Sequence, residues 1–265
     1  MRILALCKYS LDVAELRVDR ATKELKLAGV PVRIGGIDRN VVEAAVRLKE
    51  AAGGTVEGLC FGPPAARDSF KDVLAMGVDE MTLVDDPFGG QAEAEMATAV
   101  IAAAIERRGP FDAIVCGFAS DDGYTYQVGP RLSERLGLPL VSYVHSIRSA
   151  EGRLEAARDL DDRVQTVAVM PPAILSVAEE AFTPRRTTLM DALKARQKPV
   201  NLLTLDELGL GGGALEGKRR LISSSDEGLV MDRRHHVLRG APAEELADSL
   251  IDALVELDAL QEASR

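Results

Sequence analysis

One loop of this 265-residue chain separates a predicted strand from a predicted helix, and it reads Cys116-Gly117-Phe118-Ala119-Ser120-Asp121-Asp122-Gly123-Tyr124-Thr125-Tyr126-Gln127-Val128-Gly129-Pro130. Residues 112–116 are apolar and predict a buried strand, and Leu132 and Leu136 then resume helical spacing. Open α/β sheets hold nucleotides at such Gly- and Asp-rich turns, because a helix N-terminus offers unpaired N–H groups to phosphate. The alternative is an ordinary turn in which Asp121 or Asp122 only caps the helix.

The first 150 residues alternate between two hydrophobic periodicities. Short apolar runs predict strands at 2–7, 56–61, 81–84, 112–116 and 140–147. Apolar residues at helical spacing predict helices between them, at 41–52, 70–76, 93–107 and up to Gly137. Strands that alternate with helices in this way indicate βαβ units. We therefore expect an α/β fold with an open, mostly parallel sheet that is covered on both faces.

The pattern changes after Ser149. Two extended segments, 153–160 and 164–170, predict a hairpin at the edge of the sheet. An apolar run at 173–178 predicts a further strand, and residues 188–195 have the spacing of a helix. We therefore assign residues 1–196 to one nucleotide-binding α/β domain.

The remaining residues, 197–265, predict a C-terminal arm and helix. No long periodic element occurs from 197 to 240, a length that is uncommon for a loop of a compact domain. Within it, 209–214 fits the form G-x-G-x-x-A, but no adequate strand precedes it and no helix follows, so we interpret it as a linker. An amphipathic helix is predicted at 242–260, with an apolar stripe of Leu246, Leu250, Leu254 and Leu257.

Charge and composition narrow the classes of partner. Lys and Arg total 32 against 42 Asp and Glu, for a formal charge of −10, and the sequence has no basic stripe. Nucleic acids and anionic membranes attract basic surfaces, so we expect no nucleic-acid partner. No run of 18 apolar residues occurs, so we expect no membrane insertion. The chain begins directly with strand-like residues, which favours a cytoplasmic or organelle-matrix location, and we expect the cytoplasm.

Several catalytic and metal-binding patterns are missing from the sequence. Cys7, Cys60 and Cys116 lie far apart in apolar runs and are interpreted as buried core thiols. His145 and the pair at 235–236 form no zinc-binding pattern, so we expect no metal site. No nucleophile lies in a pattern with a base, so we expect a carrier rather than an enzyme.

Two segments resemble the signature of the electron transfer flavoprotein beta subunit family: Arg158-Asp159-Leu160-Asp161-Asp162-Arg163-Val164-Gln165-Thr166-Val167 and Pro172-Ala173-Ile174-Leu175-Ser176. Further blocks match the same family in order along the chain. They are Cys7-Lys8 with Asp12, Asp38 with Glu43 and 46–50, Gly62-Pro63, 74–79, Asp122-Gly123 with Thr125 and 127–130, and Pro184-Arg185 with Thr188-Leu189 and Lys194-Ala195. Each block is weakly specific, but together they are hard to obtain by chance.

The resemblance implies an alpha/beta heterodimer that carries electrons. In such proteins the alpha subunit holds the redox-active FAD, and the beta subunit binds AMP or a second FAD. The implied fold is similar to the adenine nucleotide alpha-hydrolase type, which is Rossmann-like, with an extended C-terminal arm and helix packed on the alpha subunit. The pair would accept electrons from flavin-dependent dehydrogenases and pass them to a quinone reductase or a similar acceptor.

The resemblance also implies a set of cofactor-binding residues: Leu6, Cys7, Asp38, Phe61, Gly62, Asp122, Gly123, Thr125, Gln127, Val128 and Gly129. The backbone of Thr125, Gln127 and Val128 would present N–H groups to phosphate. Gly123 and Gly129 would permit close approach of the backbone to the ligand. Asp122 would organise the ribose or the phosphate loop.

A second implied set docks a partner protein and consists of Pro184, Arg185, Thr188 and Leu189. Leu189 matches the leucine that anchors a dehydrogenase in a surface pocket. From the sequence alone, the alternative is that Leu189 belongs to the core. Gln165 falls where relatives often place a glutamate near the flavin, so any role of a charge there is lost.

The sequence departs from the family pattern at three places. Gly35-Gly36 replaces the usual Asn-Pro, and Tyr124 replaces a frequent second acid. Bifurcating relatives show a Gly-Ser-Asp-Thr run after the third strand, where residues 88–93 of this chain keep only an aromatic residue and a glycine. AMP, a second FAD and an empty site therefore all stay open. The alternative function is a stand-alone adenine-nucleotide-binding module of the universal-stress type, which uses the same strand-loop-helix site.

Overall fold

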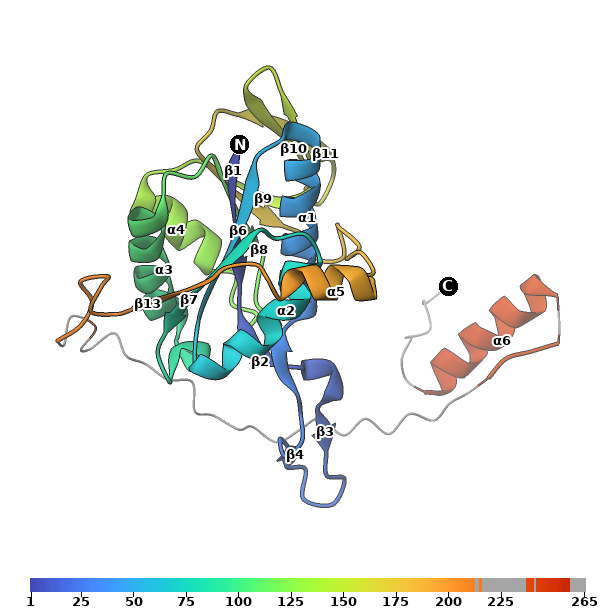
Figure 1. Ribbon diagram of the computed structural model, residues 1–265. Helices are drawn as coiled ribbons and strands as arrows, with labels where there is room; N and C mark the ends of the chain where they lie inside the picture. The colour runs from blue at the N-terminus through green and yellow to red at the C-terminus, as the bar shows by residue number, and fades with distance from the viewer. Residues whose placement is uncertain (213–214, 216–236, 241, 258–265) are drawn as a thin grey trace.

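A nine-stranded sheet forms the centre of the protein, in the order β11-β10-β9-β12-β8-β1-β6-β7-β13 (Figure 1). The computed structural model describes residues 1–212, 215, 237–240 and 242–257. The strands from β9 to β13 in this order pair in parallel, as expected for an open, mostly parallel sheet. Their bounds are β1 Arg2–Cys7, β6 Thr55–Gly62, β7 Glu80–Asp85, β8 Ala113–Gly117, β9 Leu140–Ala150, β12 Ala173–Val177 and β13 Val200–Thr204.

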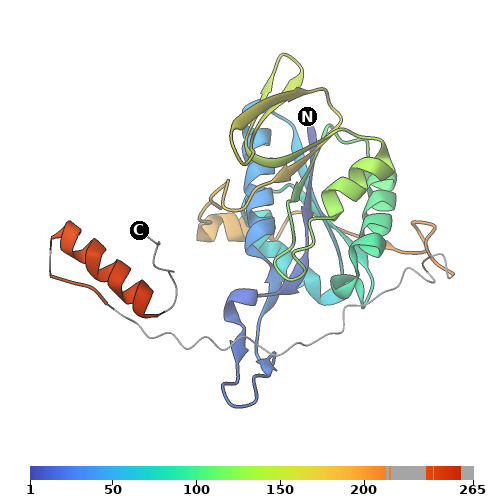
Figure 2. The same ribbon diagram turned by 180° about the vertical axis from the view of Figure 1, so that it is seen from behind.

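Helices cover both faces of the sheet (Figures 1 and 2). One face carries α1 Gly36–Ala52, α2 Arg67–Ala75 and α5 Leu189–Ala195, and the other carries α3 Ala94–Arg108 and α4 Val128–Leu136. Successive side chains of a strand point to opposite faces. In β1, Ile3 and Ala5 therefore pack with the first group of helices, and Leu4 and Leu6 pack with the second. The α/β fold with covered faces is confirmed.

An antiparallel meander closes one edge of the sheet. It consists of β9, β10 Arg153–Asp159 and β11 Val164–Val169, with β10 between the other two. Ala150 pairs with Arg153, so a two-residue turn joins β9 to β10, and both turn residues have a positive φ. Such turns match the twist of paired strands, and Gly152 adopts this conformation without strain. The hairpin predicted at 153–170 is confirmed.

The opposite edge carries a strand that the sequence interpretation missed. β13 lies inside the segment 197–240, where no long periodic element was expected, and it pairs with β7 over five residue pairs. An edge strand is covered less completely than a central one, so its hydrophobic pattern is weak. The sheet therefore extends beyond Arg196, and Leu203 packs against the face that α3 and α4 cover.

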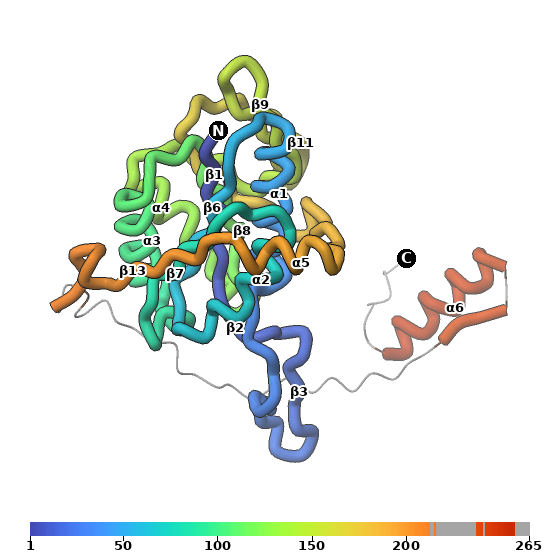
Figure 3. The backbone as a smooth tube through the Cα atoms, viewed as in Figure 1, coloured from blue at the N-terminus to red at the C-terminus, as the bar shows by residue number. Residues whose placement is uncertain are grey.

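Two smaller features complete the described structure. A ribbon projects from the sheet below α2, formed by β2 Tyr9–Leu11 with β5 Val32–Ile34 and by β3 Arg17–Val18 with β4 Leu25–Lys26 (Figure 3). These strands are too short for a sequence period to reveal. The predicted C-terminal helix is present as α6 Ala243–Glu256, and of its residues only Ala253 is buried.

Candidate functional site

The candidate site lies where the chain order in the sheet reverses. β1 is central, and the chain passes from it to β6 and β7 on one side and then crosses back to β8 on the other side. The strands β1, β6 and β8 are parallel, and their carboxyl ends at Cys7, Gly62 and Gly117 lie at the same edge of the sheet. Ligands of open α/β sheets bind in the crevice at such a switch point.

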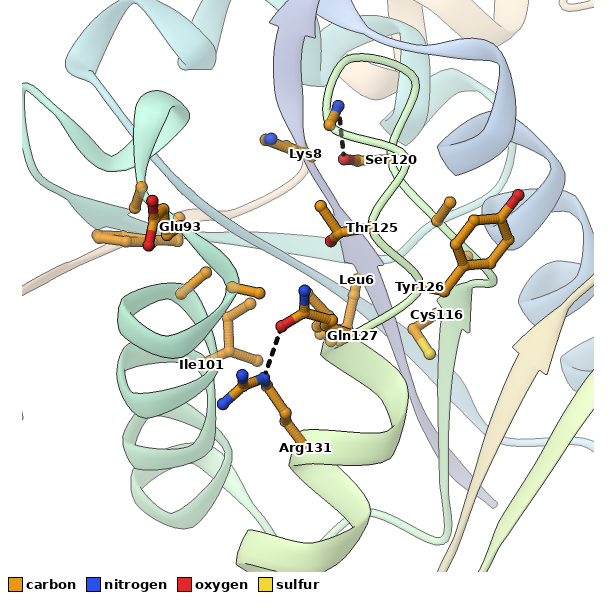
Figure 4. Close-up of a pocket in the computed structure, with 18 of the residues that line it drawn as sticks. Leu6, Lys8, Glu93, Ile101, Cys116, Ser120, Thr125, Tyr126, Gln127 and Arg131 are labelled. Atoms are coloured by element: carbon orange, nitrogen blue, oxygen red, sulfur yellow. Dashed lines mark hydrogen bonds between the residues drawn. The ribbon is translucent and has the colours of Figure 1, made fainter. Parts of the chain in front are cut away.

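A cavity of about 400 Å³ opens at this edge. The ends of β1, β6 and β8 form its floor, the loop before α4 forms one wall and the start of α3 forms the other (Figure 4). Eight of the eleven predicted cofactor-binding residues line it, namely Leu6, Cys7, Asp38, Phe61, Gly123, Thr125, Gln127 and Val128. Pockets that hold small ligands have volumes in this range.

The other three predicted cofactor-binding residues lie beside the cavity. Gly62 lies directly against the lining residue Gly89, because a Cβ on Gly89 would meet the Gly62 Cα at 2.9 Å. Gly129 is buried, and a Cβ there would lie 3.3 Å from the sulfur of Cys116. Asp122 pairs with a lysine, as described next. Whether any of the eleven residues contacts a ligand stays a prediction.

Lys8 connects the end of β1 to the nucleotide loop. Its ammonium group lies 2.7 Å from Asp122 Oδ1, and its backbone N–H donates to Asp38 Oδ2 at 3.0 Å. Burial alone would raise the pKa of Asp122, but Lys8 holds this pKa below its usual value, so the pair is ionic. Lys8 and the side chains of Asp38 and Asp122 thereby fix β1, α1 and the loop relative to one another.

Asp38 is the most perturbed acid of the site. Its side chain is 5% exposed, and burial raises its pKa to about 8, against the smaller opposing effect of the Lys8 N–H group. The neighbouring charge of Asp121 acts in the same direction as burial. At neutral pH this carboxyl group is therefore largely protonated, and it offers a hydrogen-bond donor at the floor of the cavity.

Asp121 occupies the N-terminus of α1. Residue 35 provides no side-chain cap for this helix, and Asp121 Oδ1 lies 3.5 Å from the backbone nitrogen of Ile37. Burial raises the pKa of Asp121, and its Oδ2 is buried without a hydrogen-bond partner. The first turn of α1 thus already faces a carboxylate from the nucleotide loop.

The N-terminus of α4 has a different character. Gln127 at its N-cap position makes no side-chain capping bond, and the first turn contains no acidic residue. Gln127 and Val128 line the cavity, together with Arg131 one turn further along. Unpaired N–H groups and the helix dipole favour an anion at such a helix end.

An aromatic cluster packs around the nucleotide loop, and two of its members, Phe118 and Tyr126, line the cavity. Phe118 lies at ring-centroid distances of 5.4, 5.5 and 6.1 Å from Tyr124, Tyr126 and Tyr143. The three tyrosines have positive φ angles of 48°, 60° and 57°, a conformation that is unfavourable for bulky residues. Strain of this kind gathers at functional loops. Tyr126 lines the cavity across from Glu93 in Figure 4.

The predicted docking residues lie at and before α5. Thr188 is the N-cap and forms a reciprocal capping box with Asp191, which starts the helix at Leu189. Leu189 is 78% exposed and Met190 is 60% exposed. The core alternative for Leu189 is therefore wrong. Two adjacent exposed apolar side chains indicate a surface for a partner, which stays a prediction.

Arg185 makes ion pairs within the chain, and whether it also contacts a partner stays a prediction. It clamps the segment before α5 to α1, because its guanidinium donates to Glu43 and to Glu50 at distances between 2.6 and 3.2 Å. Glu43 is 2% exposed, and its Oε2 also accepts the backbone N–H of Arg185. Asn40 and Arg47 on the same face of α1 bind the backbone at Phe182 and Thr183. Pro184 is held between these contacts.

Sequence reasoning missed several residues of the cavity. Lys8 was noted only as part of a motif. In the opposite wall, residues 89–93 were noted only as a departure from a motif, and 94–97 only as the start of a predicted helix. Arg131 was not noticed in the sequence. It follows Gln127 by four residues, a spacing that places both side chains on one face of a helix. In the structure, Arg131 Nε donates to Gln127 Oε1 at 2.9 Å.

The described residues contain no group of three or more His, Cys, Asp or Glu side chains that could hold a metal ion. The pair at 235–236 and the last two residues of the 209–214 motif lie outside them. In the part of the chain that the structure describes, no helix has the length and apolar character needed to span a membrane. Cys7, Cys60 and Cys116 are buried and free, as predicted, and burial raises the pKa of each thiol.

Known proteins resemble this chain over most of its length. Residues 26–208 match the family described as the electron transfer flavoprotein domain. An electron transfer flavoprotein subunit beta of Thermoanaerobacterium thermosaccharolyticum is 35% identical over 78% of this chain and 80% of that protein. A protein of the same name from Clostridium acetobutylicum is 31% identical over 97% and 98%. A caffeyl-CoA reductase-Etf complex subunit CarD of Acetobacterium woodii is 31% identical over 79% and 80%.

Proposed function

The chain belongs to the electron transfer flavoprotein beta subunit family, and we propose that it forms one half of a heterodimer with an alpha-type subunit that holds FAD. The family carries electrons. In this proposal the pair accepts them from a flavin-dependent dehydrogenase and passes them to a quinone reductase or a similar acceptor. The relative from Acetobacterium woodii is named as part of a reductase complex, which supports a dehydrogenase-type partner.

The cavity at the switch point carries the nucleotide part of this proposal. An adenine nucleotide needs an anion site beside an apolar space, and the cavity combines the uncapped N-terminus of α4 with Leu6, Phe61 and Ala97. The residues present therefore fit AMP or the adenosine part of a second FAD. The protonated Asp38 would donate to this ligand, and the paired Lys8 and Asp122 would hold the loop over it.

No residue of this chain needs to make or break a covalent bond in this function. A bound flavin supplies the electron-transfer chemistry, while the protein provides binding, orientation and the electrostatic surroundings. The beta subunit would contribute one wall of those surroundings, and the exposed Leu189 and Met190 of α5 would give the dehydrogenase a docking surface. We place the pair in the cytoplasm.

Co-expression of this chain with an alpha-type subunit tests the proposal. We expect a yellow one-to-one complex, and we expect mass spectrometry of the denatured complex to detect FAD together with AMP, or FAD in two copies. A colourless or monomeric product would contradict the heterodimer. The alternative, a stand-alone nucleotide-binding module, requires a folded monomer that retains nucleotide without a partner, and the similarity to named beta subunits does not favour it.

A further inference from the structure

The cavity contains two cationic side chains among the described residues that line it, Lys8 and Arg131. Lys8 is already paired, because its ammonium group contacts Asp122 at 2.7 Å. Arg131 donates its Nε to the neutral side chain of Gln127, and this bond leaves its two terminal NH2 groups for a ligand. Figure 4 shows Arg131 pointing into the space between α3 and α4, near Ile101.

Three helix N-termini lie near the cavity, and they differ in charge. That of α1 faces the carboxylate of Asp121. That of α3 carries Glu93 and Glu95, which both line the cavity and repel anions. That of α4 has neither a side-chain cap nor an acid in its first turn. Of the three, only α4 offers its N–H groups beside a cation.

We propose that Arg131 binds a phosphoryl group of the nucleotide, together with the N-terminal amides of α4, and that it sets the orientation of the ligand. A helical side chain leans toward the N-terminus of its helix, so the guanidinium and the amides can meet the same anion. The phosphoryl group then lies between α3 and α4, and the adenine ring lies toward Leu6, Phe61 and Gly89. This inference rests on the proposed function, and it adds a residue that decides specificity for phosphorylated ligands.

The test compares the variants Arg131→Gln and Arg135→Gln in the complex of the full chain with its alpha-type subunit, after the nucleotide bound by this chain has been removed. Arg135 is on the same helix one turn further along and is exposed, and it does not line the cavity, so its variant loses the same charge outside the site. The probes are AMP, ADP and adenosine, measured by equilibrium titration. Circular dichroism checks that each variant is folded, and Arg131→Lys provides a second variant with the charge kept.

We expect Arg131→Gln to weaken binding of AMP and ADP by about tenfold or more and to leave adenosine unchanged. Arg135→Gln should bind all three probes like the wild type, and Arg131→Lys should fall between the two. Equal AMP affinity of Arg131→Gln and the wild type would overturn the role of Arg131 and leave the nucleotide site standing. Equal weakening by both glutamine variants would also overturn it. A wild type that binds none of the probes would overturn the nucleotide site as well.

Discussion

The carboxylate of Asp121 fills the space in which a side chain at Gly35 would begin. A Cβ built on Gly35 would lie 1.7 Å from Asp121 Oδ2 and 2.8 Å from its Cγ. Gly36, the next residue, has room, since its Cβ would lie 3.9 Å from Asp121 Oδ1. The start of α1 therefore faces a side chain that arrives from the nucleotide loop instead of one from residue 35. The two segments are therefore coupled through one contact.

This contact predicts opposite effects at two adjacent glycines. Gly35→Ala should destabilise the protein by about 2 kcal/mol, because Asp121 must move out of a packed position. Gly36→Ala should be neutral or slightly stabilising, since it adds alanine at the first residue of α1 without a clash. Urea unfolding of both variants measures the difference.

A double mutant distinguishes the clash from a general intolerance of alanine. Asp121→Ala in the Gly35→Ala background should recover most of the lost stability, because it removes the atoms with which the Cβ collides. Additive effects of the two substitutions would show that residue 35 and Asp121 do not interact.

Asp38 predicts an unusual dependence of stability on pH. Its pKa is about 8 in the folded protein against 3.8 in the unfolded chain, so the folded state holds one more proton between these values. Stability from this group is full below about pH 4 and is lost as the pH rises through 8. Relative to Asp38→Asn, the wild type should lose up to about 1.4 kcal/mol per pH unit in this window. Denaturant unfolding from pH 5 to 9 measures the slope.

Asp122 provides the contrast for that experiment. Lys8 holds its pKa below the usual value, so its contribution is present at neutral pH and is lost as the pH falls. Asp122→Asn should therefore remove a loss of stability that the wild type shows at acidic pH. Above pH 6, the slope of stability against pH should be the same in Asp122→Asn and the wild type. If Asp38→Asn and the wild type have parallel profiles from pH 5 to 9, Asp38 is not the group responsible.

Much of this fold could be predicted because the spacing of its apolar residues is regular over most strands and helices. The buried parallel strands and the amphipathic helices α1 to α4 each repeat a pattern over several residues, and the ends of β1, β6 and β8 follow from those patterns. β13 and the ribbon of β2 to β5 could not be found this way, since they are short or half-covered and depend on contacts made far along the chain.

The loop of the candidate site could be predicted from the sequence, but most residues of the cavity walls could not. Residues from Gly123 to Val128 follow one another in sequence, so a single motif reveals them. Arg131, Glu93 and the Asp121–Gly35 contact come together only when separate elements pack. Arg185 shows the same limit, because its bonds to Glu43 and Glu50, which lie about 140 residues earlier, form only when α1 packs against the segment before α5.

Arg185 and its ionic partners Glu43 and Glu50 form a clamp, and removing it should loosen the segment before α5. Arg185→Gln removes the ionic bonds to Glu43 and Glu50 and leaves the buried Glu43 with fewer donors, so stability should fall by about 1–2 kcal/mol. Amide hydrogen exchange should rise in residues 182–190 and stay unchanged in the central strands. Arg186→Gln is the matched control, because Arg186 is exposed and adjacent. Equal exchange in both variants would show that the clamp does not hold the segment.

Substitution of Leu189 should weaken the binding of a partner protein without lowering the stability of the fold. Since this side chain is 78% exposed, Leu189→Ala should change the free energy of unfolding by less than about 0.5 kcal/mol. If α5 docks a flavin-dependent dehydrogenase, the same substitution should raise the KM for that partner about tenfold or more, as truncation of an interface anchor does. Reduction of the complex by dithionite, which needs no docking, should keep its wild-type rate.

Leu27→Ala is the matched control for this experiment, because Leu27 is also exposed but follows the short strand β4 in the projecting ribbon. It removes the same atoms from a surface far from α5 in the sequence, so the KM for the dehydrogenase should stay at the wild-type value. An equal rise in KM for both variants would point to a general loss of surface hydrophobicity. An unchanged KM in Leu189→Ala would place the docking surface elsewhere on the heterodimer, because no other large apolar residue of α5 is as exposed as Leu189 and an anchor must be reachable by its partner.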